Sequence, residues 1–131
     1  MDHDSSITIS VAPGELIDRL TILLIKEARI TDSAKLLHIR EDLAGLAASL
    51  AAIPEEQRQQ IAPLLDDLLT INACLWEVEE SLRACESAGV FDSRFVWMAR
   101  CVYLLNDGRA GLKRAISLAA GSRILEEKSY V

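Results

Sequence analysis

The chain has 131 residues, of which 50% are hydrophobic, 5% aromatic and 26% charged, and this composition is typical of one folded domain over residues 1–131. Its 20 acidic residues against 14 Lys and Arg give a formal net charge of -6, which disfavours nucleic acid and anionic lipid as partners. The longest uncharged stretch beyond the N-terminus, residues 43–54, is shorter than a membrane-spanning helix requires, so we expect no membrane span.

The N-terminal sequence and the cysteines both indicate the cytoplasm. Residues 1–4 lack the basic start of a signal peptide. The three cysteines have no C-x-x-C spacing, which suits buried, reduced thiols better than disulfides or a zinc site. No cofactor-binding motif occurs, and we expect no cofactor.

Helix breakers divide the chain into four predicted helices, which cover residues 13–30, 33–53, 63–88 and 92–120. Proline is favoured in the first turn of a helix, so Pro13 is expected to begin the first helix, and Pro54 is expected to end the second helix. Residues 54–62 could form a short helical turn, after which Pro63 either opens or kinks the third helix. Gly89 is a typical C-terminal cap residue, and Asp92 is a good N-cap for the fourth.

Apolar residues recur every three or four positions along each predicted helix, as in amphipathic helices. The stripes align if consecutive helices run antiparallel, the first stripe against the second, the second against the third and the third against the fourth. Short connections between them favour an all-α, up-down-up-down four-helix bundle. The bundle brings both chain ends together, where the extended residues 7–11 and the tail 122–131 either pair as a ribbon or leave the tail to dock on a partner.

Two charged residues interrupt the apolar stripes, Glu27 and Arg109. The chained helix registers place them near each other, so we predict that they form a buried or half-buried ion pair. Ile22 and Ile25 point away from the predicted core, which suggests a covering strand or a subunit contact.

A magnesium enzyme is one alternative, because the paired acids at Glu15 and Asp18 and at Glu77 and Glu80 resemble those of helical nucleotide pyrophosphatases. The helix register separates Glu15 from Glu77 by roughly 21 Å at 1.5 Å per residue. One metal ion cannot bridge that gap, so we expect no metal site.

The end of the bundle that holds both termini is the predicted place for any ligand site. Basic and polar side chains there could clamp a small anion such as a sugar phosphate or a nucleotide, with Glu15 or Asp18 as the acid or base. The candidate ligand-binding residues are Arg19, Asn106, Arg109, Lys113, Lys128 and Tyr130.

Several segments together resemble an uncharacterised family of small bacterial domains of unknown function. They are residues 14–23 (GELIDRLTIL), 75–77 (LWE), 91–95 (FDSRF), 99–109 (ARCVYLLNDGR) and 126–130 (EEKSY). The resemblance implies a domain that occurs alone or attached to repeat or glycosyltransferase-like proteins, and at most a link to surface-polysaccharide metabolism. Relatives commonly have a serine before the Pro-Gly-Glu start, where this chain has Ala12, so the helix cap differs here.

No complete catalytic motif is present, which favours a non-enzymatic interaction or accessory module over an enzyme. Its expected partner is another protein or a second copy of the chain, as a homodimer. The alternative is a small-molecule binding protein or enzyme with its anion site at the terminal end of the bundle.

Overall fold

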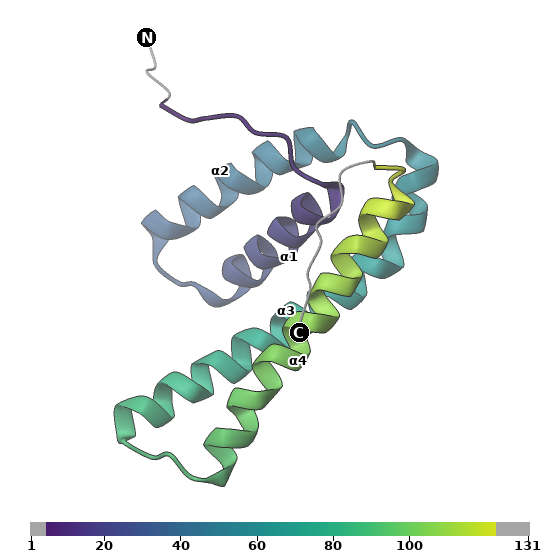
Figure 1. Ribbon diagram of the computed structural model, residues 1–131. Helices are drawn as coiled ribbons and strands as arrows, with labels where there is room; N and C mark the ends of the chain where they lie inside the picture. Colours follow the sequence, from purple (N-terminus) through teal and green to yellow (C-terminus); the bar gives the residue numbers. More distant parts are fainter. Residues whose placement is uncertain (1–4, 123–131) are drawn as a thin grey trace.

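The computed structural model describes residues 5–122, which form four α-helices and contain no strand (Figure 1). The helices are α1 (Pro13–Arg29), α2 (Ser33–Leu50), α3 (Glu55–Ala88) and α4 (Ser93–Ala119). The all-α prediction is therefore confirmed. Residues 7–11 belong to no strand within the described range, and the tail that could pair with them, residues 123–131, lies outside it.

The helix ends follow the capping chemistry of the sequence. The Asp32 and Asp92 side chains cap α2 and α4, because each accepts a hydrogen bond from the backbone N–H three residues further on. Gly89 ends α3 with a φ of 68°, a left-handed conformation that glycine adopts without strain. Helix α3 begins at Glu55, so Pro63 neither opens it nor stops it but lies within it.

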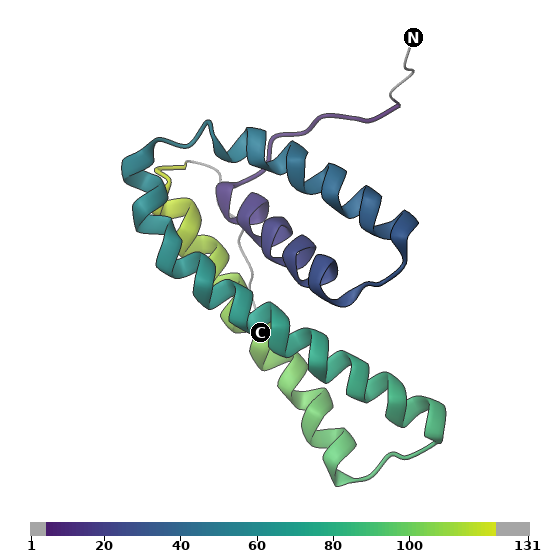
Figure 2. The same cartoon turned by 180° about the vertical axis from the view of Figure 1, so that it is seen from behind.

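Helix α1 lies between α2 and a long antiparallel hairpin formed by α3 and α4 (Figures 1 and 2). It contacts α2 on one side and both hairpin helices on the other, whereas α2, within residues 5–122, packs along α1 alone. These contacts are consistent with a four-helix bundle in which α1 takes the central place.

The expected seam between α2 and α3 is wrong, because α2 does not contact α3 in the described range. The apolar stripe of α2 packs on α1 instead. Leu75 of α3, which was expected to face α2, lines a hollow together with Ile22 and Ile25 of α1.

Helix α1 is buried on two faces, and this explains a second correction. Ile17 joins the central core cluster with Ile61, Leu68 and Ile116 from the hairpin. Ile25 is also buried, so the prediction that this face of α1 points outward is wrong. A helix in the middle of a fold needs apolar residues on both sides, and the face of α1 that we expected to be free is the one that meets the hairpin.

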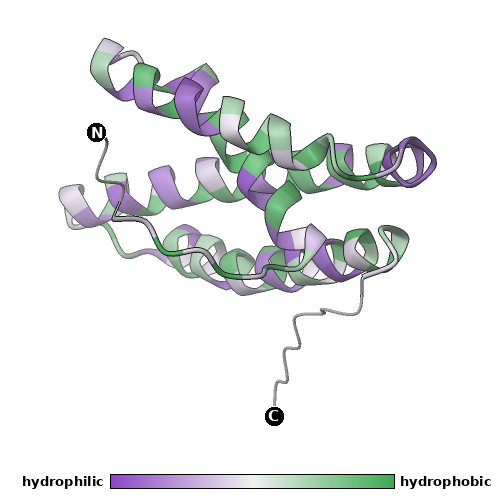
Figure 3. Cartoon of the chain, turned by 90° about the horizontal axis from the view of Figure 1, so that it is seen from above, coloured by the Kyte–Doolittle hydropathy of each residue, from purple (hydrophilic) through white to green (hydrophobic). Residues whose placement is uncertain are grey.

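Hydrophobic and hydrophilic residues are interspersed along the helices (Figure 3). Within residues 5–122, no helix is long and apolar enough to cross a membrane.

Candidate functional site

A buried carboxylate, that of Asp18, is the centre of a polar network where α1 meets the hairpin. Asp18 is only 1% exposed. Its Oδ1 accepts hydrogen bonds from Arg109 Nε at 2.8 Å and from Asn72 Nδ2 at 2.9 Å, and its Oδ2 accepts one from Arg109 Nη2 at 2.5 Å. A buried charge needs such partners, because desolvation without them costs several kcal/mol.

Two uncharged side chains complete the network. The Thr21 hydroxyl donates to the backbone oxygen of Asp18 at 2.7 Å and accepts from Asn72 Nδ2 at 2.8 Å. Asn72 is 5% exposed, and its Nδ2 thus donates two hydrogen bonds, one to Asp18 and one to Thr21. Its Oδ1 accepts no hydrogen bond from any described residue, although Asn72 lines a hollow in the surface. One acceptor in the network therefore remains available.

The pKa of Arg109 is raised above its ordinary value. The main cause is its hydrogen bonding to Asp18, and the negative charges of Asp18, Glu15 and Glu79 add to it, while burial acts in the opposite direction. The guanidinium therefore stays charged, and its charge is balanced by the carboxylate that it touches.

The predicted partner of Arg109 is wrong. Arg109 pairs with Asp18, whereas Glu27 lies 3.6 Å from Arg40 of α2. Registers that run from α1 through α2 and α3 to α4 put Leu23 level with Arg109. Because α1 packs directly on α4, Asp18, little more than one turn earlier in α1, takes that position.

The N-terminal turn of α1 is held against the end of α4. Lys113 Nζ donates to Glu15 Oε2 at 2.7 Å, and Gly14 N–H donates to Ser117 Oγ at 2.9 Å. A methyl group at position 14 would overlap the backbone carbonyl of Lys113, so only glycine permits this close approach. Arg19 Nε also reaches Glu15, at 3.4 Å.

The structure brings together the described members of the predicted anion site. Glu15, Arg19 and Lys113 meet at one end of α1, and Arg109 Nη1 lies 3.5 Å from Asn106 Oδ1. Lys128 and Tyr130 lie outside the described residues. Arg19, Arg109 and Lys113 each contact a carboxylate. The charges of Arg109 and Lys113 link α4 to α1, whereas Arg19 pairs with Glu15 within α1. Anion binding here stays a prediction.

The sequence analysis missed Thr21 and Asn72 of the Asp18 network, and Ser117, which accepts the hydrogen bond from Gly14. A signal existed for Asn72, because it stands between Leu68 and Leu75 at the spacing of core residues. A polar residue at such a position needs a buried partner.

The acidic pairs that resembled a magnesium site lie far apart. Glu15 contacts Lys113 beside the first turn of α1, whereas Glu77 contacts Arg29 in its last turn. No cluster of three or more His, Cys, Asp or Glu suited to a metal ion occurs among residues 5–122. The three cysteines are free, and Cys74 is exposed, so the expectation of buried thiols is wrong for it.

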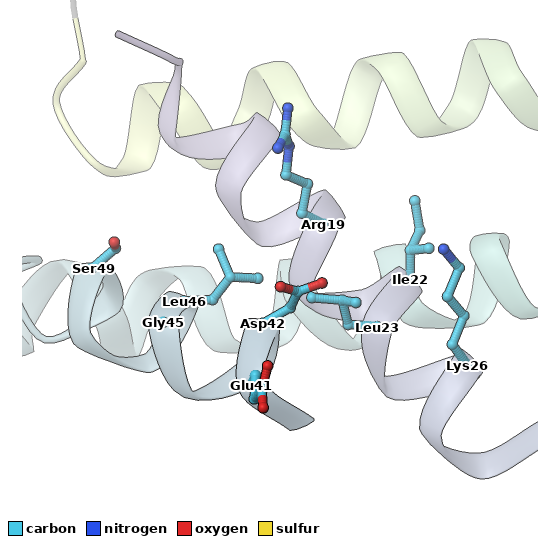
Figure 4. Close-up of a pocket in the computed structure, with 9 residues that line it drawn as sticks. All are labelled: Arg19, Ile22, Leu23, Lys26, Glu41, Asp42, Gly45, Leu46 and Ser49. Carbon is cyan, nitrogen blue, oxygen red and sulfur yellow. The ribbon is translucent and has the colours of Figure 1, made fainter. Parts of the chain in front are cut away.

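A groove of about 570 Å³ runs between α1 and α2 (Figure 4). Arg19 and Lys26 supply basic groups on the α1 side, while Glu41 and Asp42 supply acidic groups on the α2 side. Because its two walls carry opposite charges, the groove has no strong preference for an anion or a cation.

A row of apolar side chains lies open on the outer surface of α4. Trp97, Leu104 and Leu118 follow each other at seven-residue spacing and are 66%, 57% and 56% exposed. Gly111 holds the remaining position of this spacing, and a Cβ there would meet nothing within 4 Å. We call these four residues the α4 outer row.

The comparisons with known proteins agree with the family resemblance. The model of a family of unknown function (DUF6165) matches residues 7–131, and the chain belongs to this family. No curated protein and no solved structure matches the chain.

Proposed function

We propose that this protein is a non-enzymatic interaction module that forms a homodimer through the α4 outer row. The observation that carries the proposal is the exposure of Trp97, Leu104 and Leu118 in one line. Scattered exposed apolar residues are ordinary, but aligned ones that include an exposed Trp are typical of interaction surfaces.

The spacing of the row suits another helix. From Trp97 to Leu118 the row extends about 30 Å at 1.5 Å per residue, and a seven-residue repeat keeps such side chains on one face of a helix. The same helix buries its opposite face in the hairpin, where Met98 and Ile116 lie in the interior. Helix α4 is therefore apolar on two faces, and only one has a partner within residues 5–122.

The row is also complementary to itself. Trp97 and Leu118 are at its two ends, Leu104 is at one inner position and Gly111 is at the other. When two copies of α4 cross antiparallel about a twofold axis, Leu104 of each copy faces Gly111 of the other. Trp97 then faces Leu118. A twofold contact of this kind closes on itself and gives a dimer.

We place this module in the bacterial cytoplasm, where free cysteines are the normal state. A role as an accessory in surface-polysaccharide metabolism is the finer part of the proposal, and it is supported only by the resemblance to the family. The polar network around Asp18 has a structural task in this proposal, because it fixes α1 to the hairpin that carries the row.

The test compares two Leu→Glu substitutions by sedimentation equilibrium of the full chain. Leu104→Glu puts a charge in the middle of the row, and Leu37→Glu puts the same charge on α2, where Leu37 is 58% exposed. The unchanged chain and L37E should sediment as dimers, and L104E as a monomer. A monomeric unchanged chain, or a dimer that survives L104E, would overturn the proposal.

A further inference from the structure

The C-terminal half of α1 leaves a hollow of about 220 Å³ against the hairpin, beside the Asp18 network. At roughly 30 Å³ per water molecule, it has room for about seven waters or a short organic chain. Its walls come from three helices, and the residues lining it are Ile22, Ile25, Asn72, Leu75, Trp76, Glu79 and Arg109.

The polar groups of this hollow include two acceptors that no described residue uses. Asn72 Oδ1 has no donor among the described residues, although the side chain is almost fully buried. Glu79 forms no hydrogen bond or ion pair within residues 5–122, and its charge is close enough to raise the pKa of Arg109. Each can accept a hydrogen bond from a ligand in the hollow.

The charge balance favours a cation. Arg109 is the positive group in the wall, and Asp18 neutralises it through two hydrogen bonds. Glu79 therefore leaves the hollow with one negative charge. In the adjoining hollow of about 230 Å³, which shares Trp76 and Glu79, the charges of Glu80 and Arg83 offset each other.

The remaining walls suit the body of an organic cation. Ile22, Ile25 and Leu75 offer apolar surface for an alkyl chain. Trp76 lies in the wall of both hollows and donates its indole N–H to Glu80 Oε1 at 3.0 Å, which fixes the ring. An indole face attracts cations, most strongly where water is partly excluded.

We infer that this hollow binds a primary alkylammonium group, with Glu79 and Asn72 Oδ1 as acceptors and Trp76 as the aromatic wall. The ligand chemistry is the opposite of the anion expected from the sequence, and the site is independent of the α4 outer row. The ammonium group belongs either to a free amine or to a lysine side chain of another protein.

Nuclear magnetic resonance titration of the ¹⁵N-labelled full chain tests the site. The probes are 1,4-diaminobutane for a free amine, Nα-acetyl-lysine amide for a protein side chain, and Nα-acetyl-norleucine amide as the uncharged match. An ammonium probe should cause saturable shifts of the Trp76 indole N–H and Asn72 side-chain amide resonances. The Trp97 indole N–H resonance should not shift. Tighter binding of 1,4-diaminobutane would identify a free amine as the ligand, and tighter binding of Nα-acetyl-lysine amide would identify a lysine side chain. No shift with either ammonium probe, or equal shifts with the norleucine amide, would overturn the inference.

A matched pair of variants separates the site from general attraction to an acidic protein. Glu79→Gln keeps the shape of the wall and removes its charge, so binding should weaken about tenfold. Glu86→Gln removes an exposed charge two turns further along α3 and should leave binding unchanged. Urea unfolding should show that both variants keep nearly the stability of the unchanged chain, since neither side chain forms a hydrogen bond or ion pair within residues 5–122. Equal binding by E79Q and the unchanged chain would exclude this site.

Discussion

Asp18 and Arg109, 91 positions apart in the chain, form two direct hydrogen bonds between their carboxylate and guanidinium groups. The pair joins α1 to α4, and Asn72 extends the link to α3. Three helices thus meet at one buried carboxylate, which defines how α1 sits on the hairpin.

Replacing Asp18 with Ala should therefore be strongly destabilising. Arg109 and Asn72 would lose their shared acceptor inside the fold, and such a loss typically costs about 3 to 5 kcal/mol. Urea unfolding measures the change in the free energy of unfolding. Glu27→Gln is the control, because the Glu27–Arg40 pair is exposed and should contribute at most about 1 kcal/mol. If D18A costs no more than E27Q, the network does not hold α1 in place.

The raised pKa of Arg109 predicts how this stabilisation depends on pH. A cationic group whose pKa is higher in the folded state than in the unfolded state stabilises the fold. This stabilisation is complete at pH values below the pKa of the unfolded state, and it is lost only as the pH rises through the pKa of the folded state. Both values lie above the working range for arginine. The stability difference between the unchanged chain and Arg109→Gln should thus stay constant from about pH 7 to about pH 10. Urea unfolding across this range checks it, and a difference that shrinks as the pH rises would contradict the assignment.

Two glycines should respond in opposite ways to substitution by alanine. At Gly14 the added methyl group would overlap the backbone carbonyl of Lys113, which cannot move without displacing α4. Gly14→Ala should cost about 3 kcal/mol or more, as overpacking of a tight contact does. At Gly45, within α2, nothing lies within 4 Å of the added group, so Gly45→Ala should stabilise by up to about 1 kcal/mol. Thermal unfolding of both variants decides the matter, and a G14A protein as stable as the unchanged chain would show that α1 and α4 are not so close.

The helices and two of their registers could be predicted from the sequence because both depend on local patterns. Capping residues and prolines indicated where most helices begin and end, and the recurrence of apolar residues every three or four positions indicated which face is apolar. The expected alignment of α3 with α4 agrees with the position of the Ile71 side chain, which a Cβ at Gly108 would meet, and that of α1 with α2 agrees with the pair Glu27–Arg40.

The packing partner of each face could not be predicted in the same way. An apolar stripe shows that a helix needs a neighbour, but it does not identify that neighbour. The residue spacing of the α2 stripe matches α3 as well as α1. The predicted position of Arg109 relative to α1 depended on a contact between α2 and α3 that does not exist. The predicted partner of Arg109 was therefore in the wrong turn of α1. The sequence offered Asp18 as an acid or base and as half of a possible metal-binding pair, since a carboxylate among apolar residues does not by itself reveal a buried acceptor.

Gly111→Leu tests the central claim, dimerisation through the α4 outer row, most directly. The position is open in a single chain, and replacing glycine within a helix favours the helix by up to about 1 kcal/mol. The variant chain should therefore fold at least as well as the unchanged chain, while its new side chain collides with Leu104 of a second copy. Sedimentation equilibrium should find a monomer for G111L and a dimer for the unchanged chain. A G111L protein that dimerises as tightly as the unchanged chain would contradict this account.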